Sequence, residues 1–264
     1  MVFSDFIIKK FRPDFKVIKD DYFTHKDPDF FGVHGTQVFC GRQGSGKTVS
    51  AVRTVRLIKE RYPKAMIVSN LDLKDYHALK FDKLDSLRVK CTMCRKRPDK
   101  CYIQFSSLDG LELVLTQVNN GFHGVIYLID EIHTYFNALD SKNIPIHIFT
   151  EISQQRKQRK VIIGTSQLFL RMAKPFREQC DNLIMCNTLF GLFTTTTCYD
   201  AMTLTQDYDG TLHGDVKKRG WFFHDRKLRK SYDTFQKVVS SSVQFEDFAQ
   251  LHVADKKLNR KLGF

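Results

Sequence analysis

The segment 41–48 constrains this chain more than any other part of the sequence. It reads GRQGSGKT and directly follows the apolar run 37–40, QVFC. A strand, a glycine-rich turn and then a helix is the context in which the G-x-x-x-x-G-K-[ST] pattern forms a phosphate-binding loop. Glycines let the backbone N–H groups approach phosphate oxygens closely, and the following helix N-terminus adds positive potential. The sequence therefore predicts a nucleoside triphosphate site.

Two side chains of this loop have specific expected roles. Lys47 is expected to reach the β- and γ-phosphates, and Thr48 is expected to hold Mg²⁺. A glycine turn that only connects a strand to a helix would not require Lys and Thr at these positions. ATP and Mg²⁺ are the predicted cofactors. The remaining loop residues expected to contact the nucleotide are Gly41, Gly44, Ser45 and Gly46.

An acidic pair closes the apolar run 124–130, which reads GVIYLID. Asp130 is expected to orient the water shell of Mg²⁺, and the adjacent Glu131 to polarise the attacking water. The alternative is that the pair only caps the next helix. With the phosphate loop upstream, the pair favours hydrolysis over mere binding.

A polar residue at the end of the run 160–167 is expected to sense the γ-phosphate or the attacking water. Gln167 is the first choice and Ser166 the second, although Ser166 could instead cap a helix. The basic run 154–160 offers a guanidinium for a neighbouring subunit's γ-phosphate, with Arg156 preferred and Arg159 second. A solvated basic face explains the same run.

The pattern along the chain predicts an α/β fold with a mainly parallel sheet, because short apolar strands alternate with helices. We expect an N-terminal arm (1–35), an ATPase core (36–190) with a cysteine-containing insertion (71–105), and a β-rich basic appendage (191–264) ending in a helix near 245–251. The expected strands are 37–40, 65–69, 124–130, 160–164 and 182–186, and the expected core helices extend to about residue 60 and over 146–159 and 168–179.

The charge of the chain favours a polyanionic partner. The 264 residues hold 42 Lys and Arg against 29 Asp and Glu, a formal charge of +13 with a pI of about 9.4. Such an excess suits DNA, RNA or an anionic membrane surface. No stretch approaches 18 apolar residues and the N-terminus lacks a signal-peptide pattern, so neither a membrane span nor secretion is expected. The odd count of seven Cys predicts reduced thiols rather than a disulfide framework.

Three cysteines form a candidate zinc site. Cys91 and Cys94 have C-x-x-C spacing, and Cys101 could return across a hairpin as a third ligand. His77 is a distant candidate for the fourth position, which a partner chain could also supply. Three unligated thiols on a basic hairpin are the alternative.

A second basic segment, 217–230, interleaves cations with Trp221, Phe222 and Phe223. This combination suits phosphate neutralisation with stacking on single strands. A strand with one buried aromatic face and basic edges explains it equally well. The basic run 256–261 is read as a solvated tail or a docking peptide.

Five motifs together resemble the ATPase domain of the zonular occludens toxin-like assembly proteins of filamentous phages. They are 39–48 (FCGRQGSGKT), 125–133 (VIYLIDEIH), 152–157 (ISQQRK), 162–167 (IIGTSQ) and 176–179 (FREQ). That family is related to the FtsK–HerA superfamily of DNA-pumping ATPases, which includes viral genome-packaging ATPases. The resemblance implies a RecA-like core in a homo-oligomeric ring with sites between subunits. It supports Lys47, Thr48, Asp130, Glu131 and Gln167, and an Arg156 finger.

The filamentous-phage proteins carry a membrane span after the ATPase domain, and this sequence shows none. The expectation is therefore a viral genome-packaging ATPase that pumps DNA, acting in the host cytoplasm or on the virion with a capsid or portal vertex. The first alternative is an assembly or secretion ATPase that acts with a membrane protein complex. A nucleotide-dependent scaffold without hydrolysis is a rival of another class.

Overall fold

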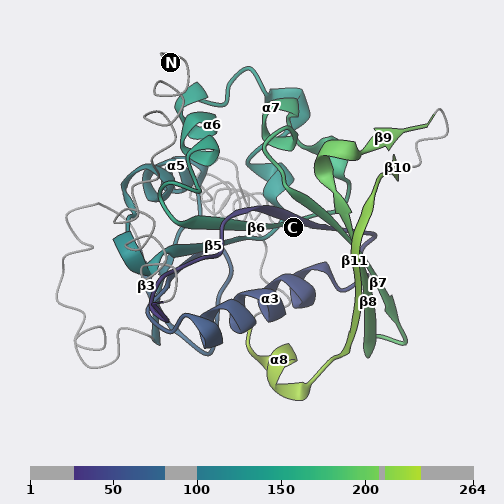
Figure 1. Cartoon of the computed structure of the whole chain (residues 1–264), viewed down its shortest axis with the longest axis horizontal. Helices are drawn as coiled ribbons and strands as arrows, with labels where there is room; N and C mark the ends of the chain where they lie inside the picture. The colour runs from purple at the N-terminus through teal and green to yellow at the C-terminus, as the bar shows by residue number, and fades with distance from the viewer. Residues whose placement is uncertain (1–26, 81–99, 208–211, 233–264) are drawn as a thin grey trace, which may run out of the picture.

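A nine-stranded sheet organises the molecule (Figure 1). The structure is a computed structural model, and it describes residues 27–80, 100–207 and 212–232. The strand order is β11-β8-β7-β1-β6-β5-β2-β4-β3. Every pairing from β7 to β3 is parallel, whereas β8 and β11 join antiparallel at one edge. The predicted α/β class with a mainly parallel sheet is confirmed.

The five predicted strands are all present. The continuous apolar strand β5 is buried at every position, as expected for a strand with both faces covered. Neighbouring residues on β1 point to opposite sides, so Val38 joins one core and Phe39 the other. The parallel strands are β1 (Gly35–Cys40), β2 (Met66–Ser69), β3 (His77–Lys80), β4 (Cys101–Gln104), β5 (Val125–Ile129), β6 (Lys160–Ser166) and β7 (Asn182–Leu189).

Helices cover both faces of the sheet (Figure 1). Helices α3 (Lys47–Arg61) and α8 (Arg226–Lys230) lie on one face. Helices α5 (Leu108–Gln117), α6 (Ile146–Ser153) and α7 (Lys174–Arg177) lie on the other. Helix α3 ends close to the predicted residue 60.

Two predicted helices are shorter than expected. Helix α6 ends at Ser153 rather than at 159, because after Ile152 no apolar residue follows until Val161 to hold a further turn on the sheet. The predicted helix 168–179 is instead a 3₁₀ turn, Phe169–Arg171, followed by α7. Pro175 explains the interruption, since it lacks the N–H that would bond to the Arg171 carbonyl and its ring would clash with that oxygen.

The C-terminal strands extend the core sheet. β8 (Phe193–Asp200) pairs with β7 along its whole length, and β11 (Val216–Phe223) pairs with β8. The short strands β9 (Thr205–Gln206) and β10 (Leu212–His213) form a separate ribbon. The chain after residue 190 is β-rich as predicted. The division into three domains stays a prediction, as does the helix near 245–251, which lies outside the described residues.

The segment predicted as an insertion contributes an edge to the sheet. Strands β3 and β4, at its two ends, continue the sheet beyond β2, and α5 follows β4. Neither strand nor α5 is predicted from the sequence. Residues 81–99 between the two strands lie outside the described part of the chain.

The end of the predicted N-terminal arm packs on the core. The Phe31 side chain is buried and its backbone N–H donates to the Phe122 carbonyl at 3.1 Å. Gly124, at φ +69°, has no room for a side chain, since a Cβ there would lie 2.1 Å from the Phe31 ring. Residues 27–35 are therefore fixed against the start of β5.

Candidate nucleotide-binding site

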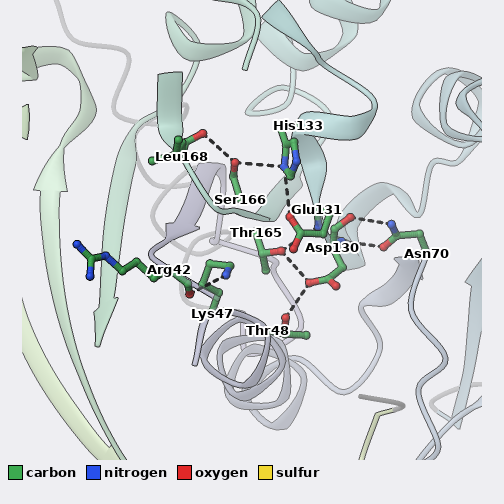
Figure 2. A network of polar contacts seen from close by, with 10 residues as sticks. All are labelled: Arg42, Lys47, Thr48, Asn70, Asp130, Glu131, His133, Thr165, Ser166 and Leu168. Carbon is green, nitrogen blue, oxygen red and sulfur yellow. Dashed lines mark hydrogen bonds and ion pairs between the residues drawn. The ribbon is translucent and has the colours of Figure 1, made fainter. Parts of the chain in front are cut away.

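The order of the parallel strands brings the motifs together at one edge of the sheet. The phosphate loop follows β1, and its neighbour β6 has Ser166 in register with Cys40. β5 lies on the far side of β6, and Asp130 and Glu131 follow its last residue. Because the carboxyl ends of parallel strands meet at one edge, the loop, the acidic pair and the end of β6 face one another (Figure 2).

The loop has the backbone conformation that its glycines allow. Gly44 and Gly46 have φ values of +77° and +84°, and α3 begins directly at Lys47. The Lys47 side chain is buried, and its Nζ donates to the Arg42 carbonyl across the loop at 3.1 Å. The lysine ammonium and the helix N-terminus therefore point into the same hollow.

Three side chains form a compact oxygen cluster beside the loop (Figure 2). The Thr48 hydroxyl donates to Asp130 Oδ1 at 2.9 Å, and the Thr165 hydroxyl donates to the same oxygen at 2.7 Å. Burial is the main cause that raises the pKa of Asp130, while both hydroxyls and Lys47 act in the opposite direction. Hydroxyl and carboxylate oxygens are the ligands that Mg²⁺ prefers. Thr48 and Asp130 fit the expected metal site.

Asn70, directly after β2, holds the peptide of Asp130. Its Oδ1 accepts from the Asp130 N–H at 2.8 Å and its Nδ2 donates to the Asp130 carbonyl at 2.9 Å. This bidentate contact fixes where the carboxylate points. Asn70 and Thr165 are missed by the sequence analysis. The signal was a polar residue at the end of an apolar strand, which is the same signal that identifies Asp130.

Glu131 stands in a strained backbone position. Its φ of +48° is uncommon for a residue other than glycine and is typical of functional sites. The Glu131 N–H donates to Thr165 Oγ1 at 2.9 Å, and its Oε2 lies 3.2 Å from His133 Nδ1. Burial is the largest cause that raises the pKa of Glu131, followed by the charge of Asp130. A carboxylate held in this way suits a general base.

His133 is a further residue that the sequence analysis misses. Burial, reinforced by Arg171 and Lys47, lowers its pKa, and its Nδ1 lies 3.2 Å from Glu131 Oε2. Ser166 Oγ donates to the Leu168 carbonyl at 2.9 Å, which ties it to its own loop. Gln167 lines the hollow instead.

The hollow is a cavity of about 820 Å³, large enough for a nucleotide. Its walls come from the phosphate loop, the acidic pair, the end of β6 and, unexpectedly, the segment after β11. That last group is absent from the predicted site. The lining side chains and glycines are Gln43, Gly44, Gly46, Lys47, Thr48, Val49, Asp130, Glu131, His133, Thr134, Gln167, His224, Arg229 and Tyr232.

The two predicted arginines lie at the amino ends of the parallel strands, whereas the phosphate loop lies at their carboxyl ends. Arg156 is exposed on the turn after α6, before the amino end of β6. The Arg159 guanidinium packs over the rings of Phe30 at 4.4 Å and Phe122 at 5.0 Å. Neither belongs to the site of its own chain. Arg156 is exposed, whereas Arg159 is engaged in packing.

The predicted zinc ligands are only partly described. Cys91 and Cys94 lie outside the described residues. Cys101 is buried at the start of β4, in register with His77 on β3. Among the described residues, no group of three or more Cys, His, Asp or Glu could hold a metal ion. Cys40, Cys180 and Cys186 are buried and Cys198 is partly buried, and burial raises the pKa of each thiol.

The comparisons with known proteins agree with this geometry. The family profile described as zonular occludens toxin (Zot) matches residues 36–234. The chain belongs to the Zot family. No curated protein is detectably similar to it in sequence.

Solved structures resemble this Zot-family chain in fold. The N-terminal domain of zonular occludens toxin from Neisseria meningitidis is 16% identical, with a TM-score of 0.51, over 76% of this chain and 100% of that one. The genome packaging NTPase B204 from Sulfolobus turreted icosahedral virus 2, in complex with ATP-gammaS, is 13% identical, with a TM-score of 0.48, over 70% and 97%. Within the described part of the Zot-family chain, no helix is long and apolar enough to cross a membrane.

Proposed function

We propose that this Zot-family NTPase hydrolyses ATP to move a nucleic acid, as a viral genome-packaging motor. The observation that carries the hydrolytic part is the placement of Glu131 beside the oxygen cluster of Thr48 and Asp130. The formal charge of +13 supports a polyanionic partner.

Each residue of the site has a separate role in the proposed reaction. Backbone N–H groups of the loop and Lys47 would bind the phosphates, and Thr48 and Asp130 would hold Mg²⁺. The bound metal ion would neutralise charge that develops on the phosphates. Glu131, whose backbone N–H donates to the Thr165 hydroxyl and whose carboxylate lies beside His133, would accept a proton from the attacking water. Gln167, at the wall of the cavity, would sense the γ-phosphate.

The outer face of the C-terminal strands supports contact with a nucleic acid. Phe222 is buried, whereas Trp221 and Phe223 are 66% and 68% exposed. Phe193 on β8 lies 5.7 Å and 5.0 Å from these two rings, between ring centroids. Arg219, two residues before Trp221, is also exposed. Exposed rings beside a cation suit stacking on unpaired bases.

Membership of the Zot family favours a second candidate. A phage assembly or secretion ATPase would use the same nucleotide site to move virion components at a membrane complex. In that case the exposed rings of β11 would contact a protein partner. The FtsK–HerA relationship, a ring of subunits and an Arg156 finger remain parts of the proposal under either function.

ATP turnover with and without DNA separates these functions. Wild-type protein is expected to hydrolyse ATP, and single- or double-stranded DNA is expected to raise the rate. Lys47→Ala should abolish turnover, and Glu131→Gln should bind ATP normally but turn over at least about 100-fold more slowly. Turnover that ignores DNA but responds to a membrane or coat-protein fraction would favour the second candidate. A Glu131→Gln rate within about twofold of wild type would show that Glu131 is a helix cap and not the general base.

The zinc site stays a prediction. If Cys91, Cys94 and Cys101 share one ion, His77 is the natural fourth ligand, because it stands beside Cys101 in the register of β3 and β4. Metal analysis of the purified full chain should then find one Zn²⁺ per chain. A content well below one equivalent removes this site without affecting the ATPase proposal.

A further inference from the structure

The segment after β11 is docked against the nucleotide site of its own chain. Leu228 and Tyr232 are buried in the core on the α3 side of the sheet. The Lys74 N–H donates to the Ser231 carbonyl at 2.9 Å, and Leu73 forms an antiparallel bridge with Tyr232. These contacts fix the position of helix α8 beside the phosphate loop.

Two polar side chains of this segment line the nucleotide cavity and contact each other. Arg229 Nη2 lies 3.2 Å from His224 Nδ1 and also donates to the Gly191 carbonyl. Because Nδ1 accepts from the guanidinium, the neutral imidazole carries its proton on Nε2. That atom lies 2.6 Å from Thr194 Oγ1 and donates to it. The His224 imidazole therefore holds the Arg229 guanidinium in position by accepting a hydrogen bond from it.

The same chain of contacts reaches the phosphate loop. Thr194 Oγ1 lies 2.5 Å from Thr188 Oγ1. A Cβ added to Gly46 would lie 2.3 Å from the Thr188 hydroxyl and 2.7 Å from that of Thr194, so the loop packs directly on this pair. The position of Arg229 is thus set relative to the loop by two threonines and one histidine.

The Arg229 guanidinium has N–H donors that these two contacts do not use. Within the described residues its two contacts both use Nη2, and no carboxylate lies within ion-pair distance. A guanidinium has five N–H donors in a rigid fork that matches phosphate oxygens. A cation without an acidic partner, in a cavity built for phosphate, is complementary to a phosphate group.

We propose that Arg229 binds a phosphate group of the nucleotide held by the same chain, and that His224 positions its guanidinium. The inference rests on the proposed function, because it assigns a ligand group to the same cavity. It differs from the Arg156 finger, which would act on the site of a neighbouring subunit. Arg229 is expected to act in an isolated chain.

Equilibrium binding of ATPγS and of adenosine tests the assignment, with Arg226→Ala as the matched control, since Arg226 is an exposed cation on the same helix. Arg229→Ala should raise the dissociation constant for ATPγS by about tenfold or more, because a hydrogen bond to a charged group is lost. It should leave the dissociation constant for adenosine unchanged. Arg226→Ala should change neither value by more than about twofold.

His224→Ala tests the positioning role. His224→Ala should weaken ATPγS binding less than Arg229→Ala does. The double variant should bind ATPγS no more weakly than Arg229→Ala alone, because both changes act on the same contact between Arg229 and the phosphate. Should Arg229→Ala fold poorly, Arg229→Gln keeps a polar side chain without the charge and should show the same loss of ATPγS affinity.

The outcomes separate this inference from the proposed function. Wild-type protein that binds ATPγS while Lys47→Ala does not keeps the nucleotide site. If Arg229→Ala and Arg229→Gln then bind ATPγS as tightly as Arg226→Ala does, the assignment of Arg229 is overturned alone. If wild-type protein does not bind ATPγS, both fall.

Discussion

At the scale of single residues, the buried carboxylate of Asp130 is unfavourable for stability but is needed for the proposed metal binding. A buried charge is unfavourable without a cation, which is why burial raises its pKa. Asp130→Asn keeps an oxygen for the Thr48 and Thr165 hydroxyls and removes the charge. We expect the unliganded variant to melt no lower than wild type. The increase in melting temperature that MgATP gives wild-type protein should be lost.

Thermal melting with and without MgATP measures both effects. Asp215→Asn is the control, because Asp215 is exposed and does not line the cavity. A full MgATP-dependent increase in Asp130→Asn would show that this carboxylate does not hold the metal ion.

Single residues also show how far the sequence could go. Lys47 and Thr48 could be predicted because the loop is a local pattern of eight positions. Asn70 and Thr165 could not, because their roles depend on strands that are distant in sequence meeting at one edge of the sheet. His224 and Arg229 were further out of reach, since nothing local indicates that the segment after β11 returns to the loop.

At the scale of elements, the packing of the phosphate loop on β7 and β8 predicts a difference between two glycines. Gly44 and Gly46 both have positive φ, so alanine costs about 1–2 kcal/mol at either position. A Cβ at Gly44 meets open space, whereas one at Gly46 meets Thr188 and Thr194. Gly46→Ala should therefore lower the free energy of unfolding more than Gly44→Ala does, without nucleotide present.

Chemical denaturation measures the two free energies. Adding Thr188→Ala to Gly46→Ala should recover part of the loss, since it removes the closer of the two oxygens. Equal losses at the two glycines, or no recovery, would contradict this packing.

The contacts of Arg159 predict a structural role for this residue. Its guanidinium packs on the rings of Phe30 and Phe122 and thereby joins the segment before β1 to the start of β5. Arg159→Ala should lower the free energy of unfolding by about 1–2 kcal/mol, the size of a partly buried cation–π contact. Arg156→Ala, at an exposed position on the same turn, should leave it unchanged. Denaturation curves of Arg159→Ala and Arg156→Ala measure both free energies of unfolding. Equal values for the two variants would contradict the packing role of Arg159.

Elements were predicted well where burial alone determines them. The five central strands are apolar runs, and both core faces follow from their composition. Helix ends were predicted poorly, because the end of α6 depends on where its apolar face stops and the split after β6 depends on a single proline. The edge strand β3 and its neighbour β4 are short and carry little pattern of their own.

At the scale of the whole molecule, the location of Arg156 on the edge opposite the phosphate loop predicts dependence on assembly. ATPase activity per chain should rise with protein concentration if Arg156 completes a neighbour's site. Arg156→Ala should bind ATP but lose turnover. Mixing it with Glu131→Gln protein should restore up to about a quarter of the wild-type rate, since random mixing pairs an intact Glu131 with an intact Arg156 at that share of interfaces.

Turnover of the mixture is compared with that of each variant alone, while size analysis verifies that mixed assemblies form. Mixed assemblies without any recovery would show that Arg156 does not act on a neighbouring site.

The register of β1 has a consequence for how the protein is made. Gly35 pairs with Val161 on β6, and Gln37 pairs with Asn182 on β7, so both neighbours of β1 are synthesised long after it. At about 5–20 residues per second, roughly 6–25 s pass between β1 and β6 on the ribosome. Throughout that interval both edges of the apolar strand β1 are unpaired, so they can pair wrongly with strands of other nascent chains. The central position that later buries the phosphate-loop strand leaves it without its second neighbour until β7 has been made.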